Sequence, residues 1–126
     1  MTDLLIDTDV CVDHLAGRAR LPRRRGGLGY SVITRAELRA GASSALEAEQ
    51  IRRLLAAMVE YPVDRPIADE AGRIRHESGV RLPDALIAAT ALVHGLTIDT
   101  RNDPTSDASP DYAYDADAEH PRRPAQ

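Results

Sequence analysis

The chain contains no phenylalanine and no tryptophan, and all 16 of its basic residues are arginine, so it has no lysine. The missing lysine excludes Schiff-base chemistry, a phosphate-binding P-loop and the lysine of a phospho-receiver domain. The few aromatic residues, four tyrosines, mean that the core must be aliphatic. The single cysteine, Cys11, cannot form an internal disulfide, which favours a reduced setting, and its apolar neighbours predict a small core residue.

Two further features are missing from the sequence. The N-terminus "MTDLLID" has no basic region before an apolar run, so we find no signal peptide. The longest apolar run is far shorter than the ~20 residues that a membrane-spanning helix needs. A length of 126 residues fits one domain with one core, and we therefore expect a soluble, cytoplasmic domain.

The charge is unevenly distributed along the chain. Residues 1–101 carry 14 acidic and 14 basic side chains, whereas residues 102–126 carry six acids against two arginines. That last stretch also has no Leu, Ile or Val and holds four of the eight prolines. Such a composition cannot bury enough apolar surface to fold. We predict a domain at 1–102 and an atypical acidic, proline-rich tail at 103–126 that is disordered.

Hydrophobic patterning in the first 102 residues alternates between strand-like and helix-like segments. It predicts strands at 3–8, 28–34, 59–63 and 96–100 and helices at 9–17, 34–42, 45–58, 65–78 and 83–94. Alternation of this kind is typical of an α/β fold with a parallel sheet covered by helices on both faces.

The segment "RLPDALIAATALVHGL" (81–96) contains the most apolar of these helices. Between residues 85 and 93 only Thr90 is polar, and a helix that is apolar on every face is normally buried. Asp84 lies in its first turn, where the helix dipole favours a negative charge by roughly 0.3–1 kcal/mol. The dipole is a sufficient structural explanation for Asp84 taken alone.

Two other acids have structural explanations of the same kind. Asp7 ends the first strand and could cap the next helix, a role that Thr8 or Asp9 could fill equally well. Glu37 completes a capping-box pattern that begins at Thr34.

Taken together, Asp7, Glu37 and Asp84 suggest a functional site. They follow the first strand, follow the second strand and open the buried helix, positions that a parallel sheet brings to one edge. Asp103, just past the last strand, is a fourth candidate. Carboxylates gathered in this way repel one another and are costly to desolvate, and a divalent cation such as Mg²⁺ removes both penalties. The pattern predicts an acidic metal pocket for phosphodiester hydrolysis, in which one metal activates water and a second, if present, stabilises the leaving oxygen.

Four segments carry a specific resemblance: "LLIDTDVCVDHL", "YSVITRAELRAGA", "VDRPIADEAGRIR" and "LPDALIAATALVHGLTIDTRN". In this order and spacing they resemble the PIN-domain ribonucleases, and most closely the VapC-type toxins of type II toxin–antitoxin systems. The resemblance runs from about residue 4 to residue 102. It implies a three-layer α/β/α sandwich with a central parallel sheet of four strands, where the family normally has five.

The resemblance also implies site residues, a cofactor and partners. It assigns Asp7, Glu37 and Asp84 to the metal site and places Thr8, Ser31, Thr100 and Asn102 at polar positions of the pocket. It implies Mg²⁺- or Mn²⁺-dependent endonucleolytic cleavage of RNA, a homodimer, and a small VapB-like antitoxin that blocks the site.

After Asn102 the sequence departs from the family pattern. Relatives continue as T-R-N-x-x-D-F followed by an apolar strand, whereas this chain has Thr105 at the position of the late Asp and no Phe. Asp103 or Asp107 could supply the fourth carboxylate. Without the last strand a sheet edge is left uncovered. A PIN-like protein that no longer cleaves RNA and only binds its antitoxin is therefore one alternative.

Two further interpretations remain open at this stage. "RARLPRRR" (18–25) holds five arginines that either contact RNA phosphates or form a solvated loop. "LLIDTDV" also resembles the first motif of haloacid-dehalogenase-type phosphatases, with Asp7 as nucleophile and Asp9 as acid/base. That chemistry needs a supporting Lys or Arg and a later Gly-Asp pair. The chain has no lysine and no convincing pair, which makes this alternative the weaker one.

Overall fold

Four short parallel strands form the centre of the fold, in the order β3-β2-β1-β4. The computed structural model describes residues 2–100. The strands are β1 (Leu4–Ile6), β2 (Gly29–Ser31), β3 (Val59–Tyr61) and β4 (Thr97–Asp99), and the helices are α1 (Thr8–Leu15), α2 (Val32–Gly41), α3 (Ala45–Ala56), α4 (Arg65–Ser78) and α5 (Leu82–His94). Asn102, Asp103, Asp107 and the predicted tail lie outside the described residues.

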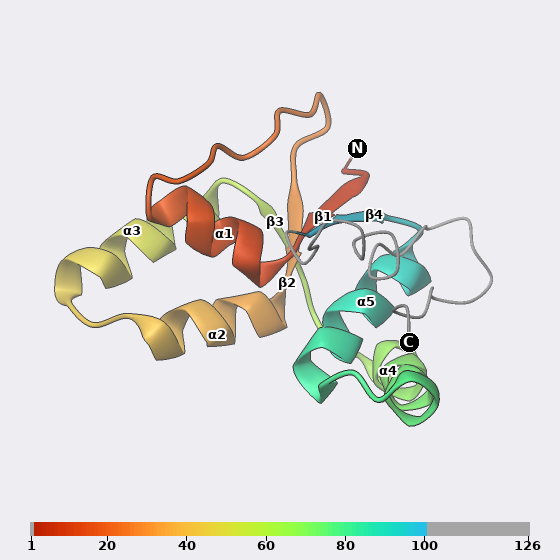
Figure 1. The fold of residues 1–126 in the computed structure, drawn as a ribbon. Coiled ribbons are helices and arrows are strands. Elements are labelled where there is room, and N and C mark those ends of the chain that lie inside the picture. The colour runs from red at the N-terminus through yellow and green to blue at the C-terminus, as the bar shows by residue number, and fades with distance from the viewer. Residues whose placement is uncertain (1, 101–126) are drawn as a thin grey trace.

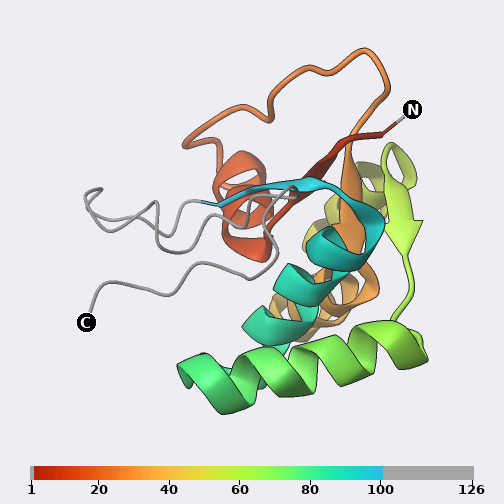
Figure 2. The ribbon, with the colours of Figure 1, turned by 90° about the vertical axis from the view of Figure 1, so that its right-hand side faces the viewer.

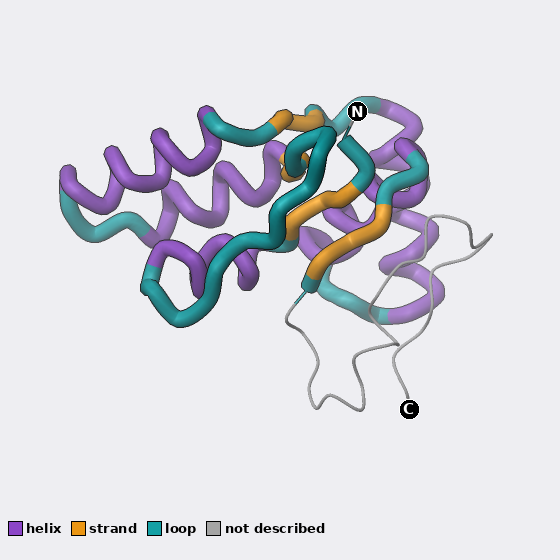
Figure 3. The backbone as a smooth tube through the Cα atoms, turned by 90° about the horizontal axis from the view of Figure 1, so that it is seen from above, coloured by secondary structure: helices purple, strands orange, loops and turns teal. Residues whose placement is uncertain are grey.

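Helices cover both faces of the sheet. Figures 1 and 3 show α1, α2 and α3 on one side of the strands and α4 and α5 on the other. Side chains alternate along β1 accordingly: Leu5 packs with α4 and α5, whereas Leu4 and Ile6 pack in the second core cluster with residues of α1 to α3. The predicted three-layer α/β/α sandwich with four parallel strands is confirmed for residues 2–100.

The helix α5 is the most buried element, as its sequence predicts. Its buried residues are Ala85, Ile87, Ala88, Ala89, Thr90 and Ala91. The hydroxyl of Thr90 donates to the carbonyl of Leu86 at 2.8 Å, so the one polar side chain in this run has a partner. Figure 2 shows α4 lying along α5, and Gly95 ends the helix with a left-handed φ of 68°. Among residues 2–100 no helix is long and apolar enough to cross a membrane.

The boundary between β2 and α2 differs from the sequence prediction. The β-branched run Val32–Thr34 favours a strand, yet the strand ends at Ser31 and the helix begins at Val32. Ser31 caps the helix, because its hydroxyl accepts the N–H of Ile33 at 3.0 Å. The predicted capping box from Thr34 to Glu37 is therefore wrong, and Glu37 lies in the second turn with its carboxylate available to another partner.

Cys11 is part of the core, as predicted from its apolar neighbours. Its side chain is fully buried with Leu4, Ile6 and Tyr30. Burial raises the pKa of the thiol to about 12, so it is not a nucleophile at neutral pH.

Candidate functional site

The carboxyl ends of β1 and β4 meet at one edge of the sheet, where Asp7 and Thr100 follow the two strands. The N–H of Asp7 donates to the carbonyl of Asp99 at 2.9 Å, which continues the pairing of the strands by one residue. The hydroxyl of Thr100 donates to Oδ2 of Asp7 at 2.9 Å. In open α/β sheets this edge is where ligands bind.

Asp7 has two roles at once. It is the N-cap of α1, since its Oδ1 accepts the N–H of Thr8 at 2.7 Å. Its pKa is raised from 3.8 to about 6, first by desolvation and also by the negative charges of Asp9 and Asp84, although its two hydrogen bonds act in the opposite direction. No basic side chain of residues 2–100 forms an ion pair with Asp7, so the described part of the chain leaves this carboxylate without a neutralising charge.

Glu37 is connected to the site by a hydrogen bond with Thr8, the residue after Asp7. The hydroxyl of Thr8 donates to Oε1 of Glu37 at 2.6 Å and lies 2.9 Å from the hydroxyl of Thr34. Because the single proton of Thr8 is used on Glu37, the Thr34 hydroxyl donates to Thr8. Thr34 is fully buried, so this chain of three polar groups joins α1 to α2 inside the fold. It places Glu37 directly beside the residue that follows Asp7.

Asp84 lies at the start of α5 and is about half exposed. Its carboxylate is paired with Arg81, three residues earlier, through Nε at 3.2 Å and Nη2 at 3.5 Å. The pKa of the Arg81 guanidinium is raised first by this hydrogen bond and also by the charges of Glu37 and Asp9. Since the charge of Asp84 in turn raises the pKa of Asp7, these groups act on one another electrostatically.

A divalent cation fits these side chains in donor chemistry. Carboxylate oxygens are the ligands that Mg²⁺ prefers, and one or two of them suffice, because the ion keeps several waters. The desolvated, uncompensated carboxylate of Asp7 is suited to a cation. Among residues 2–100, however, no three acidic, His or Cys side chains are arranged to hold a metal, and Asp84 is occupied by Arg81. The remaining candidate ligands, Asp103 and Asn102, lie outside the described residues.

The other predicted pocket residues are placed as follows. Ser31 ends β2 at the same edge of the sheet, but its hydroxyl is used to cap α2. Thr8 and Thr100 contact Glu37 and Asp7 directly. Sequence reasoning missed Thr34 and Arg81. The position of Arg81, one helical turn before Asp84, was a usable signal, whereas nothing local marks Thr34 as a partner of Thr8.

The arginines of residues 18–25 lie away from these acids. They belong to the loop that joins the end of α1 to the start of β2, which in a parallel sheet is the amino-terminal edge (Figure 1). Arg24 contacts Asp3 at 3.4 Å, and the Thr2 hydroxyl donates to the carbonyl of Gly26 at 3.1 Å, which ties the loop to the start of β1. The loop and the acids therefore lie at opposite edges of the sheet.

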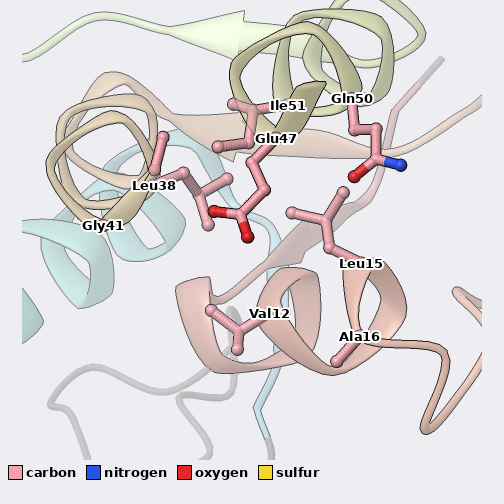
Figure 4. A pocket seen from close by; sticks show the side chains of 9 residues that line it. Val12, Leu15, Ala16, Leu38, Gly41, Glu47, Gln50 and Ile51 are labelled. Carbon is pink, nitrogen blue, oxygen red and sulfur yellow. The ribbon is translucent and has the colours of Figure 1, made fainter. Parts of the chain in front are cut away.

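An apolar groove lies apart from the acids, between α1, α2 and α3 (Figure 4). It is lined by Val12, Leu15, Ala16, Leu38, Gly41, Ala42, Glu47, Gln50 and Ile51. None of the candidate site residues contributes to this lining.

Comparison with known proteins agrees with the fold. A family profile described as "PIN domain" matches residues 4–107. A comparison with curated protein sequences finds no match.

Several solved structures have the same fold. A structure of VapBC-5, a member of the VapBC family of toxin–antitoxin systems from Mycobacterium tuberculosis, has 32% identity and a TM-score of 0.57, over 81% of this chain and 86% of that chain. A toxin–antitoxin complex from Klebsiella pneumoniae has 30% identity and a TM-score of 0.66, over 79% of this chain and 86% of that chain. A DNA-bound VapBC from Salmonella typhimurium has 25% identity and a TM-score of 0.64, over 76% of this chain and 83% of that chain. The chain belongs to the PIN-domain family, and it resembles the VapC-type toxins within that family.

Proposed function

We propose that this chain is the toxin of a toxin–antitoxin pair and a Mg²⁺-dependent endoribonuclease. The observation that carries the proposal is the desolvated carboxylate of Asp7, which lies at the ligand-binding edge of the sheet in the field of Asp84. Two findings support it. PIN domains are generally nucleases, and the solved relatives belong to toxin–antitoxin complexes.

Asp7 and Asp84 would hold the cation, with Glu37 as the third acid and Asp103 as the fourth candidate. Mn²⁺ could replace Mg²⁺, since both ions suit oxygen ligands. When bound there, the ion supplies a positive charge that lowers the pKa of an attacking water and offsets the charge of the phosphodiester.

The chain's own contribution is to hold the acids in place. Both oxygens of Asp7 accept hydrogen bonds, from the Thr8 N–H and the Thr100 hydroxyl, so its side chain is fixed before a ligand arrives. Glu37 is fixed by the Thr8 hydroxyl. Asp84 stands on a helix that is locked in the core. Because Asp7 and Glu37 are oriented in advance, they would bind a cation with little cost of reorganisation.

The partners follow from the same proposal. The solved relatives come from toxin–antitoxin complexes, which supports a VapB-like antitoxin that binds this chain and blocks its site. RNA is the substrate, the chain forms a homodimer and it acts in the cytoplasm. We further propose that the folded domain is 1–102 and that residues 103–126 are an addition to it.

A second candidate is a PIN-like protein that binds its antitoxin without cleaving RNA. Two observations favour it: Asp84 is paired with Arg81, and Thr105 stands where the family has a late Asp. The phosphatase alternative has no such support, since the chain belongs to the PIN-domain family.

One experiment separates the two candidates. The full wild-type chain is incubated with a mixed RNA pool in Mg²⁺ and in EDTA. The variants Asp84→Asn and Asp69→Asn are treated in the same way. Asp69 is an exposed acid of α4 and serves as a control for the loss of one negative charge. We expect cleavage by the wild type and Asp69→Asn in Mg²⁺ alone, and none by Asp84→Asn. A wild type that binds the antitoxin and cuts no RNA supports the second candidate, and equal activity of Asp84→Asn contradicts the assigned site.

A further inference from the structure

Within residues 2–100, Arg81 is the basic residue that forms an ion pair with an acid of the candidate site. It is the N-cap residue of α5, and its side chain makes no capping hydrogen bond. Its guanidinium instead turns toward the first turn of the helix and contacts both oxygens of Asp84, at 3.2 and 3.5 Å. The Arg81 side chain is 71% exposed, so it is free to leave this position.

No other basic side chain is placed in this way within the described part of the chain. The remaining arginine ion pairs in residues 2–100 engage Asp3, Asp13, Glu49, Glu60, Glu70 and Glu77. The charges of Glu37 and Asp9 also raise the pKa of Arg81, so the guanidinium lies within electrostatic reach of acids on α1 and α2. The arginine loop cannot take this role, because it lies at the opposite edge of the sheet.

We propose that Arg81 is an internal counter-ion of the acidic site, which competes with the divalent cation for Asp84 and, once displaced, binds the phosphate backbone of the RNA substrate. This inference rests on the function proposed above. Both oxygens of Asp84 are in contact with Arg81, so a cation bound to this carboxylate competes with the positively charged arginine for the same oxygens and repels it.

The released side chain suits a phosphate. A guanidinium presents a planar fork of donors that binds phosphate oxygens in pairs, and its long stem allows it to swing without moving the helix. An exposed i,i+3 ion pair is weak, so the exchange is readily reversible. Arg81 therefore has two positions: it pairs with Asp84 while the site is empty and contacts the substrate when the cation is bound.

The experiment compares three variants of the full chain with the wild type. Arg81→Gln removes both the charge and the fork, and Arg81→Lys keeps the charge but loses the fork. Arg52→Gln is the matched control, because Arg52 forms the same two-contact i,i+3 pair with Glu49 on α3, away from the site. The Mg²⁺ dissociation constant is measured by calorimetry without RNA, and KM is measured on one RNA oligonucleotide.

We expect opposite shifts in the two measurements for Arg81→Gln. Mg²⁺ should bind about two- to fivefold more tightly, a range set by the small strength of an exposed ion pair. KM for RNA should rise about tenfold, in line with one lost charge-assisted contact. Arg81→Lys should leave Mg²⁺ binding near the wild-type value and still raise KM, and Arg52→Gln should change neither.

Unchanged or weaker Mg²⁺ binding by Arg81→Gln overturns the counter-ion role, and an unchanged KM overturns the contact with RNA. A purely structural role would lower the melting temperature without moving the two constants in opposite directions. If the wild type binds Mg²⁺ and cleaves RNA while Arg81→Gln behaves like Arg52→Gln, only this inference fails. If the wild type itself binds no Mg²⁺, the proposed function fails.

Discussion

The hydroxyl of Thr100 donates a hydrogen bond of 2.9 Å to Oδ2 of Asp7, two residues that are 93 positions apart in the sequence. The bond joins the end of β4 to the end of β1 and orients the first acid of the candidate site. It also places Thr100, the first residue of the predicted "TRN" pocket segment, against the first acid. The order of the strands, with β4 beside β1, is what makes this contact possible.

Replacing Asp7 with asparagine should abolish RNA cleavage and stabilise the cation-free protein at pH 7. Burial raises the pKa of Asp7 from 3.8 to about 6, so its ionised form is destabilised in the folded state, by at most about 3 kcal/mol. Asparagine has nearly the same shape and carries no charge. Urea denaturation in EDTA measures the gain, and an Asp7→Asn protein less stable than the wild type at pH 7 contradicts the assignment.

The stability gain from Asp7→Asn should depend on pH. The folded pKa of Asp7 lies above its unfolded value, so the folded state binds the proton more tightly. The contribution of this proton binding to the stability of the wild type is complete below pH ~4 and is lost as the pH rises through ~6. The difference between wild type and variant should therefore be near zero at pH 4 and largest at pH 7. Denaturation curves at both pH values test this, and a difference independent of pH would show that Asp7 is not the titrating group.

Mg²⁺ should raise the melting temperature of the wild type at pH 7 and leave those of Asp7→Asn and Asp84→Asn unchanged. A ligand that binds only the folded state stabilises it by about 2.7 kcal/mol at a concentration of 100 times its dissociation constant. Below pH ~6 the effect should fade, because a protonated Asp7 is a poor ligand. Thermal melting with and without EDTA measures the shift, with Asp69→Asn as the control. An equal shift in all variants would indicate binding elsewhere.

Thr8→Val should weaken both stability and cleavage. The change removes the hydroxyl that donates to Glu37 and accepts from Thr34, and Thr34 is fully buried. A buried polar group left without its partner costs about 1–3 kcal/mol, and a carboxylate without its donor is less well oriented. Thr8→Ser retains the hydroxyl and should restore most of both properties. Urea denaturation and RNA cleavage measure the two effects, and full activity of Thr8→Val would mean that Glu37 needs no positioning by Thr8.

Neutralising the arginine loop should have little effect on cleavage of a short RNA. Arg23 and Arg25 lie on the loop at the amino-terminal edge of the sheet, and within the described residues neither forms an ion pair. The double variant Arg23→Gln/Arg25→Gln should keep KM for a short oligonucleotide within about twofold of the wild type, since contacts far from the reacting phosphate add only screened attraction. Steady-state kinetics measure KM at 0.15 M salt, where the Debye length is ~8 Å and distant charges are screened. A KM increase as large as that of Arg81→Gln would place the loop in the substrate path.

Several features of this protein were determined by the sequence alone. The helix α4 spans Arg65–Ser78 as predicted, because Asp64 caps its start, Pro66 lies in its first turn and Gly79 ends it with a left-handed φ of 77°. The helix α5 is buried because its central residues are apolar all round. Asp7 directly follows β1, whose three residues are all apolar and buried. These signals act over a few residues, so no knowledge of the packing is needed to recognise them.

Only the tertiary structure decided the environment of the site. The start of α2 at Val32 and the bond from Thr8 to Glu37 replaced a capping box that the local pattern favoured. The elevated pKa of Asp7 comes first from its burial in the fold. The arginine loop and the acids were assigned to opposite edges by the direction of the parallel strands. Desolvation and hydrogen bonds between distant segments depend on which strands are neighbours, and local sequence patterns do not contain that information.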